Sequence, residues 1–254
     1  MGEPGGKNKP PAEGRGSGFV LVVDSDAQSL VIMAMILQRL GYLVCTANAA
    51  DKALEMAHYS PPSLVIAAMD LRGMTGLALM HRLRDEVRTA AVPVLIMTRE
   101  HDRDFSKRCG DAGAAGALPI PVQANDLYQA INRIINPRSR RADFRIPTSL
   151  PAMLNGRALD AGAGEAVTNL SVNGVYLRSR TTFTVQTLVR IDLTLHGETI
   201  TAEARVVYLS PAGAGNSGLS GMGLQFTSIS PRGREIIRAF IHTEVTHGLA
   251  PGMA

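Results

Sequence analysis

The first half of the chain alternates between short apolar runs and longer segments with helical spacing. Residues 19–23 are wholly apolar and too few for a helix, so they predict a buried strand. Residues 29–40 repeat apolar positions at helical spacing, and Gly41 predicts the end of that helix. The alternation continues with strands expected at 43–46, 64–68, 92–97 and 115–118 and helices expected at 50–57, 76–87, 104–112 and 125–135. These repeats predict an α/β fold with a doubly wound, five-stranded parallel sheet, and any site at the C-terminal ends of its strands.

After Pro137 the pattern changes to short segments in which apolar and polar residues alternate. Val189, Ile191 and Leu193 alternate with polar residues, as in a strand that has one face in water. Similar segments at 175–177, 200–208 and 223–226 are separated by Gly, Asn and Ser residues. This spacing predicts a small antiparallel barrel or sandwich. A final helix is expected at 233–245, with an apolar stripe formed by Ile236, Ile237, Phe240 and Ile241.

The N-terminal residues 1–18 differ from both halves. They are mostly Gly, Pro and polar types, which bury too little surface to offset the entropy of ordering, so we expect a disordered tail. We therefore divide the chain into this tail, a first domain at 19–136 and a second domain at 137–248. The longest apolar run, 30–37, is too short to cross a bilayer, and the N-terminus lacks a signal-like apolar stretch. A cytoplasmic protein is the expectation.

Arginine dominates the basic residues of the chain. Of the 26 Lys and Arg residues, 22 are arginines, and no lysine follows Lys107. The formal net charge is +4, and the whole surplus falls after Pro137. The planar guanidinium forms paired hydrogen bonds to phosphates and to guanine, although a genome-wide preference for arginine explains the composition equally well. The cysteines, Cys45 and Cys109, and the scattered histidines show no metal-ligand or nucleophile spacing, so we expect neither a metal nor catalysis.

Residues at the expected strand ends carry a family resemblance. Asp24 follows the first strand, Thr98 follows the fourth, Ile120 and Pro121 follow the fifth, and a loop with two glycines spans 73–76. With the alternating elements, these positions resemble the receiver domain of two-component response regulators over residues 19 to 136. The resemblance implies a phosphoryl acceptor at the end of the third strand, an acid pair that holds magnesium, a hydroxyl residue and a lysine.

The chain departs from the receiver pattern at three of those positions. The acceptor position holds Ala68, the second acid is replaced by Ser25 and the lysine is replaced by Ile120. A methyl group cannot take a phosphoryl group, and the other two changes remove most of the metal affinity and charge neutralisation. We therefore expect a pseudo-receiver with no phosphoacceptor. Whether Asp26 or Asp70 substitutes in phosphorylation or metal binding stays open.

The receiver resemblance also implies a surface for partners. In that family, the face formed by the fourth helix, the fifth strand and the fifth helix docks partners or forms dimers. The apolar residues expected there, some of which belong to the core, are Phe105, Leu127, Tyr128, Ile131 and Ile134. We expect a protein partner or a second copy of the chain on this domain, and neither nucleic acid nor a membrane as a partner.

Two further motifs, Arg-x-x-x-Arg and Asn-x-Ser-x-x-Gly, follow the change of pattern. Their residues are Arg141, Arg145, Asn169, Ser171 and Gly174. Together with a closing strand at 221–226 and the final helix, they resemble the PilZ domain over residues 138–246. The resemblance implies a six-stranded antiparallel barrel with a C-terminal helix, which binds cyclic di-GMP through these five residues.

The chemistry of cyclic di-GMP agrees with these residue types. The ligand has two phosphates and two guanines, so its binder needs fixed cations and paired hydrogen-bond donors, and Arg141 and Arg145 supply both. Asn169 and Ser171 are expected on a rigid turn, where they accept from guanine or hold a phosphate. Gly174 permits a sharp turn or a close approach to the ligand. A solvated linker and a plain hairpin turn are the alternative interpretations of the two motifs.

Arg140, directly before the first motif, implies a ligand stoichiometry. In the PilZ family, a basic residue at that position accompanies the capture of two stacked ligand molecules. The sequence thus predicts a non-catalytic effector that binds one or two molecules of cyclic di-GMP, which order residues 138–145 and change how the domains sit. Two alternatives stay open: a ligand-independent scaffold, and a response regulator that is phosphorylated at another site.

Overall fold

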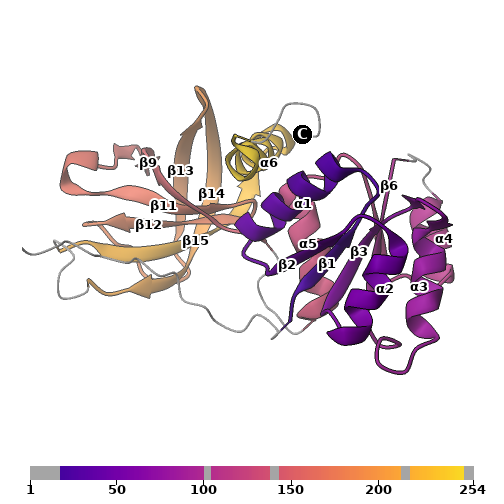
Figure 1. The fold of residues 1–254 in the computed structure, drawn as a ribbon. Helices are drawn as coiled ribbons and strands as arrows, with labels where there is room; N and C mark the ends of the chain where they lie inside the picture. The colour runs from indigo at the N-terminus through magenta and orange to yellow at the C-terminus, as the bar shows by residue number, and fades with distance from the viewer. Residues whose placement is uncertain (1–17, 100–103, 138–142, 213–217, 249–254) are drawn as a thin grey trace, which may run out of the picture.

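The computed structural model describes residues 18–99, 104–137, 143–212 and 218–248 (Figure 1). Its first sheet is parallel, with the strand order β2-β1-β3-β6-β7. The strands are β1 (Val20–Val23), β2 (Val44–Ala47), β3 (Leu64–Ala68), β6 (Val94–Thr98) and β7 (Gly116–Pro119). A two-stranded hairpin of β4 (Asp70–Leu71) and β5 (Met74–Thr75) follows β3. The predicted five-stranded parallel sheet is confirmed.

Helices cover both faces of this parallel sheet. They are α1 (Ala27–Arg39), α2 (Ala50–Tyr59), α3 (Gly76–Arg84), α4 (Phe105–Asp111) and α5 (Ala124–Ile135). Successive strand residues point to opposite faces, so each strand feeds two apolar clusters. Val20 and Val22 pack with α1 and α5, whereas Leu21 and Val23 pack with α2, α3 and α4. The C-terminal strand ends therefore lie at one edge between two helical layers.

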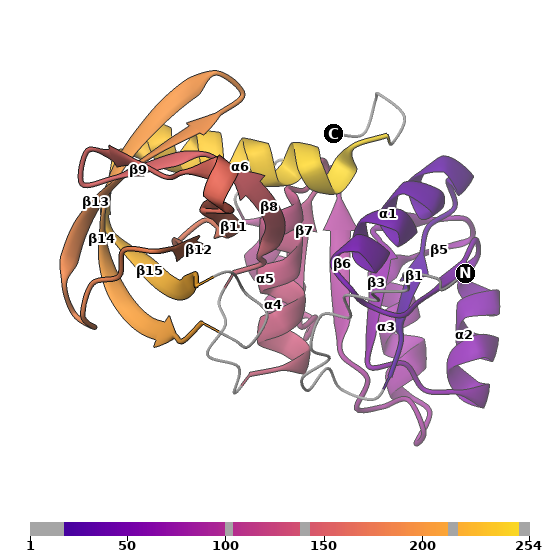
Figure 2. The same cartoon turned by 90° about the vertical axis from the view of Figure 1, so that its left-hand side faces the viewer.

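The second sheet is antiparallel and curled (Figure 2), and we call it the curled sheet. Its strand order is β10-β9-β13-β14-β15-β12-β11-β8. The strands are β8 (Ile146–Leu150), β9 (Ala152–Leu154), β10 (Arg157–Ala158), β11 (Ala166–Ser171), β12 (Gly174–Ser179), β13 (Leu188–Leu195), β14 (Glu198–Ser210) and β15 (Ser220–Ile229). A short 3₁₀ helix (Ala161–Ala163) precedes β11.

The antiparallel class is confirmed, but the strand count differs from the expected six. The described residues form eight strands, because β9 and β10 make an additional hairpin at one end of the sheet. These two strands are three and two residues long, which is too short for alternation to predict them. Alternation predicted β13 residue for residue, since its eight residues present one buried and one exposed face.

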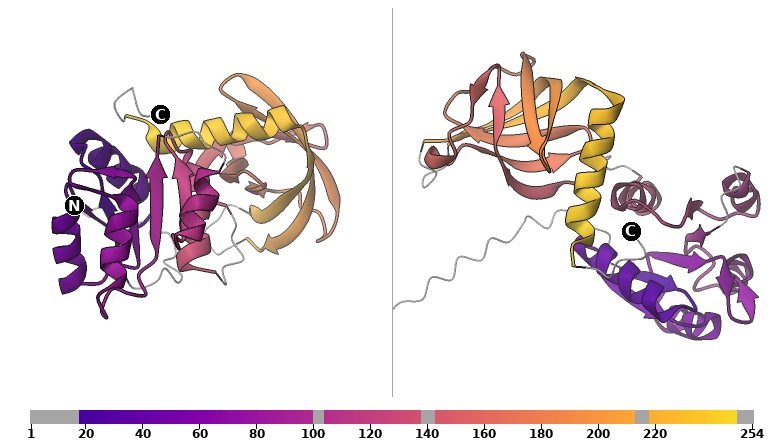
Figure 3. Two further views of the ribbon diagram at one scale, coloured as in Figure 1. Left: turned by 90° about the vertical axis from the view of Figure 1, so that its right-hand side faces the viewer. Right: turned by 90° about the horizontal axis from the view of Figure 1, so that it is seen from above.

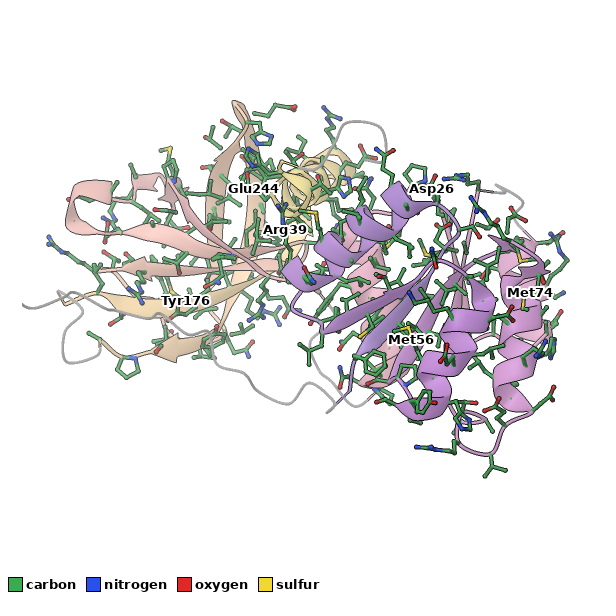
Figure 4. The ribbon with its side chains drawn as sticks, in the orientation of Figure 1. Asp26, Arg39, Met56, Met74, Tyr176 and Glu244 are labelled. Atoms are coloured by element: carbon green, nitrogen blue, oxygen red, sulfur yellow. The ribbon has the colours of Figure 1, made fainter. Side chains whose placement is uncertain are left out.

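Helix α6 (Pro231–Thr246) joins the two sheets into one body. It lies between the curled sheet and helices α1 and α5 (Figure 3). Its apolar stripe belongs to one cluster that also contains side chains of α1, α5 and the inner face of the curled sheet. The Arg39 guanidinium of α1 donates to the carbonyl oxygens of Val245 and His247, each at 2.7 Å, and Figure 4 shows Arg39 beside α6. The expected flanking helix is therefore also the main contact between the two halves.

A buried carboxylate fixes the start of β11 within the curled sheet. Glu165 is 1% exposed and accepts from the Arg157 guanidinium at 3.0 and 3.1 Å. It also accepts from the hydroxyl of Ser179 and from the backbone N–H groups of Asp160 and Arg180. These hydrogen bonds, the Arg157 bond above all, lower the pKa of Glu165 to about 2. The Glu165 carboxylate accepts five hydrogen bonds, which satisfy its buried charge. These bonds tie β10, the 3₁₀ turn and β12 together.

Candidate functional site

The outer face of the curled sheet carries a hollow of about 740 Å³. It lies over strands β11, β12, β14 and β15 and beside the segment that precedes β8. Its lining consists of Asp143, Arg145, Asn169, Ser171, Asn173, Gly174, Val175, Tyr176, Val207, Tyr208, Gly223, Leu224 and Gln225. Four of the six residues predicted for ligand binding are therefore brought together. The other two, Arg140 and Arg141, lie outside the described residues.

Two rows of paired residues cross the strands under this hollow. In the first row, Asn169 of β11 pairs with Tyr176 of β12, Tyr176 pairs with Gly223 of β15, and Gly223 pairs with Tyr208 of β14. Figure 4 labels Tyr176 on the strands of the curled sheet. Residues in register on adjacent strands lie side by side, so this row places an amide next to two aromatic rings.

The second row begins two residues along β11. Ser171 pairs with Gly174, Gly174 pairs with Gln225 and Gln225 pairs with Arg205. Because side chains alternate between the faces of a strand, a two-residue step keeps this row on the same face as the first. The row places the Ser171 hydroxyl and the Gln225 carboxamide in the lining of the hollow, and Arg205 lies outside that lining. Gln225 was expected in the closing strand but not among the ligand-binding residues.

Asn169 and Ser171 do not lie on the turn where they were expected. Both belong to β11, and only Val172 and Asn173 separate that strand from β12. The Ser171 hydroxyl is buried and donates to the carbonyl oxygen of Gly174 at 3.1 Å. The strand thus holds both motif side chains more rigidly than a turn would.

Gly174 is required for a reason that differs from the expected one. Its backbone does not adopt a positive φ angle. Instead, a Cβ atom at this position would overlap the carbonyl oxygen of Leu224 on β15. A glycine is therefore needed for the close approach of β12 to β15, not for a turn.

Arg145 is the described member of the arginine motif. It is exposed and stands directly before β8, whose Ile146 pairs with Leu170 of β11. In that register Asn169 pairs with Pro147, so Arg145 falls opposite Ser171 at the rim of the hollow. An exposed guanidinium at the rim of a hollow can bind a phosphate or a guanine edge through paired donors.

Asp143 connects the hollow to the parallel-sheet half. Its carboxylate accepts from the Gln129 side chain of α5 at 2.7 Å and from the Asn173 side chain on the β11–β12 turn. The side-chain Oδ1 of Asn173 accepts from the Arg234 guanidinium of α6 at 2.5 Å. The next residue, Phe144, packs on Tyr128 of α5 with the ring centroids 5.4 Å apart. The motif search passed over Asp143, although it lies between the two motif arginines.

The C-terminal edge of the parallel sheet has only a small cavity. Asp24, Ala68 and Ile120 line a cavity of about 10 Å³ together with apolar side chains. That volume holds one water molecule at most. Ala68 ends β3, as expected, and Thr98 is buried at the end of β6 without lining the cavity.

Polar groups around this edge are bonded to the local backbone. The Asp24 carboxylate accepts from the N–H of Asp26 at 3.0 Å, and the Ser25 hydroxyl accepts from the N–H of Arg72 at 2.7 Å. Asp26 caps α1 by accepting from two backbone N–H groups, with Ser29 the larger cause of its lowered pKa. Asp70 is exposed in β4 and does not line the cavity. These contacts match structural roles in turns and caps.

Most of the apolar residues expected on a docking face belong to the core. Phe105, Leu127 and Ile131 are buried, and Ile134 packs against the larger apolar cluster. Tyr128 contacts Phe144, as described above. The α5 part of the expected docking face is thus occupied by the chain's own second half, because α6 and the segment before β8 pack there.

The described part of the chain has neither a metal-binding cluster nor a membrane-spanning helix. No group of three or more His, Cys, Asp and Glu side chains is placed there to hold a metal ion. No helix in those ranges is long and apolar enough to span a membrane.

Comparisons with known proteins agree with the two motif sets. The family model described as "Response regulator receiver domain" matches residues 20–132, and the model described as "PilZ domain" matches residues 139–243. The "Two-component response regulator ORR6" of Oryza sativa subsp. japonica is 30% identical over 118 residues, which are 45% of this chain and 69% of that protein. The regulator ORR5 of the same subspecies is 28% identical over 121 residues, or 47% and 90% of the two chains.

Solved structures of receiver domains are also similar to this chain. A response regulator receiver domain protein from Clostridium thermocellum is 27% identical, has a TM-score of 0.44, and is matched over 48% of this chain and 96% of its own. Chemotaxis protein CheY4 of Vibrio cholerae is 26% identical with a TM-score of 0.43, over 46% and 98% of the two chains. The two family models by themselves confirm both resemblances drawn from the sequence motifs.

Proposed function

We propose that this chain, which belongs to the response-regulator family and joins a receiver domain to a PilZ domain, is a non-catalytic effector that binds cyclic di-GMP in the hollow. Receiver and PilZ domains are signalling domains, and PilZ domains bind cyclic di-GMP. We assign residues 19–136 to a pseudo-receiver and 137–248 to the PilZ domain. Binding through Arg140, Arg141, Arg145, Asn169, Ser171 and Gly174, and the cytoplasmic location, stay predictions from the sequence.

The observation that carries the proposal is the convergence of motif residues on the hollow. Arg145, Asn169, Ser171 and Gly174 come from three segments of the chain and line one cavity of about 740 Å³. Cavities of 300–1,000 Å³ with a few convergent polar groups are typical of small-ligand sites. A guanidinium at the rim and an amide on the sheet match the phosphates and guanines of the ligand.

The receiver half is proposed to act without phosphorylation. Ala68 has no oxygen to accept a phosphoryl group, and its cavity has no room for a phosphate. Asp24, Ser25 and Asp26 are engaged by backbone N–H groups around the same edge. The receiver domain then serves as an interaction domain that is controlled from the PilZ side.

The Asp143 contacts give that control a physical route. Gln129 and Tyr128 of α5 hold Asp143 and Phe144, which belong to the Arg-x-x-x-Arg segment. A ligand that reorders this segment must alter its contacts with α5. The energy available is the difference in ligand affinity between the two arrangements.

Calorimetric titration of the full chain with cyclic di-GMP tests the proposal. Wild type should bind with micromolar or tighter affinity, and Arg145→Ala should weaken binding at least about tenfold, since a charge-assisted contact is lost. Arg190→Ala is the matched control, because Arg190 is an exposed arginine of β13 outside the hollow and should leave affinity unchanged. No heat and no thermal shift with wild type would indicate the ligand-independent scaffold instead.

The same titration gives the stoichiometry. If Arg140 captures a second stacked molecule, the endpoint lies near two per chain and Arg140→Leu lowers it to one. An endpoint that does not change in Arg140→Leu would contradict this role and leave the binding proposal standing.

A further inference from the structure

The two tyrosines under the hollow form a stacked pair. The rings of Tyr176 and Tyr208 are 5.9 Å apart between centroids and inclined by 16°. They come from β12 and β14, which are separated by β15, so their chain positions do not place them side by side. Both residues pair with Gly223 of the intervening strand. The rings therefore meet above a strand residue that has no side chain.

Glycines on β15 make this arrangement possible. A Cβ atom at Gly223 would overlap the ring of Tyr208, and a Cβ atom at Gly221 would overlap the ring and hydroxyl of Tyr176. The rings therefore lie down against the backbone of β15 instead of standing away from the sheet. Tyr208 is still 42% exposed, so part of its surface faces the hollow.

The surroundings of the pair match a flat, polar-edged ligand group. Asn169 continues the same row next to Tyr176, and Gln225 and Ser171 lie in the row two residues along. All of these line the hollow, and Arg145 stands at its rim. A base stacked on the rings would thus have carboxamides at its edge. The phosphate of the same nucleotide would lie near a cation. Bases stack on aromatic side chains in this way, because every base has a flat π-face.

We propose that Tyr176 and Tyr208 form an aromatic platform on which a guanine ring of the bound nucleotide stacks. The inference rests on the proposed function and deepens it, because it adds residues outside the two sequence motifs. The platform supplies stacking to the flat face of the base, while Asn169 and Arg145 supply hydrogen bonds at its edge and at the phosphate. Tyr208 is the more exposed member and is the residue on which affinity should depend most.

Titration of Tyr208 variants of the full chain with cyclic di-GMP tests the platform. Tyr208→Ala should raise Kd about tenfold or more, the loss expected when one base–aromatic stack is removed. Tyr208→Phe keeps the ring and should stay within about twofold of wild type. Tyr59→Ala, an exposed tyrosine at the end of α2, is the control and should change nothing. A Tyr208→Ala variant that is folded by circular dichroism and binds like wild type would overturn the proposal.

A fluorescence measurement separates failure of the platform from failure of the proposed ligand. The chain contains no tryptophan, so Tyr208→Trp introduces a single reporter. Its emission should be quenched by cyclic di-GMP through stacking. If wild type does not bind cyclic di-GMP, guanosine monophosphate is titrated into the same variant: quenching then supports the platform without that ligand, and an unchanged emission overturns it.

Discussion

The C-terminal edge of the parallel sheet has a cavity of only about 10 Å³, whereas the outer face of the curled sheet has a hollow of about 740 Å³. Both regions carry residues at family motif positions. At the first, Asp24 and Ser25 accept hydrogen bonds from backbone N–H groups, and a methyl group stands at the acceptor position. At the second, Asn169 and Arg145 line an open space. The difference teaches that a motif supports ligand binding only under two conditions. Its polar atoms must not be used up by bonds to the backbone, and the cavity beside them must be large enough for the ligand.

The two sheets reach this difference through their construction. The receiver edge lies between two helical layers, so a lost functional side chain is replaced by apolar packing from Met33, Met97 and Ile120. The hollow lies on the outer face of the curled sheet, and the apolar core lies on the other face. Its floor depends on glycines such as Gly174 and Gly223, where a side chain would overlap the Leu224 carbonyl oxygen or the Tyr208 ring. Stability and binding can therefore be separated in the curled sheet by mutation.

The largest expected effect concerns Glu165. Glu165→Gln should lower the free energy of unfolding by about 3 kcal/mol at pH 7, because the Arg157 guanidinium loses its buried carboxylate. Asn169→Ala should instead remove ligand affinity and keep nearly all stability, since Asn169 faces the hollow. Urea unfolding and calorimetric titration of the two variants measure both quantities. Equal losses of stability in the two variants would contradict the idea that stability and binding depend on different residues of the curled sheet.

The same residue gives a pH dependence with a defined sign. Its folded-state pKa is lowered from 4.5 to about 2, so its contribution to stability is complete above pH 4.5 and is lost as the pH falls toward 2. The stability difference between wild type and Glu165→Gln should shrink over that window. Glu203→Gln, an exposed change on β14, is the control and should show no such window. A difference that is constant from pH 7 to pH 3 would contradict the assignment.

A new carboxylate placed in each region tests the comparison directly. Ala68→Asp should lower the free energy of unfolding by about 2 kcal/mol, because it adds a second carboxylate beside Asp24 in a cavity that holds one water molecule at most. Asn169→Asp should change it by about 0.5 kcal/mol or less, because the hollow is open and Arg145 lines it. Urea unfolding at pH 7 measures both.

A phosphorylation assay provides a second measurement on the Ala68→Asp variant. Ala68→Asp supplies an acceptor oxygen, but Ser25 and Ile120 still replace the second acid and the lysine. Acetyl phosphate with magnesium should therefore leave Ala68→Asp unmodified by mass spectrometry. A stable and phosphorylated Ala68→Asp variant would show that the receiver edge has room for a phosphoryl group. That result would contradict the contrast drawn between the small cavity and the hollow.

Local patterns predicted the elements far better than the site. Continuous apolar runs gave β3, and strict alternation gave β13, because each pattern is complete within a few residues. The motif spacing also gave Asn169 and Ser171. By contrast, Tyr176 and Tyr208 meet only through the register of β12, β15 and β14, and no local pattern contains that register. The contacts of Asp143 could not be predicted for the same reason, since its partner Gln129 belongs to the other half of the chain.

The smallest expected effect probes the link between the two regions. The Asp143 carboxylate accepts a hydrogen bond from Gln129, and a ligand that pulls this segment toward the hollow would break that bond. Gln129→Ala removes the bond in advance, so Kd for cyclic di-GMP should fall about two- to fivefold, as for one modest hydrogen bond. The gain should vanish when Asp143 is already alanine, and Gln28→Ala, an exposed change on α1, should have no effect. Weaker binding by Gln129→Ala would mean that α5 supports the liganded arrangement of the arginine segment, and the direction of coupling between the domains would then be the reverse.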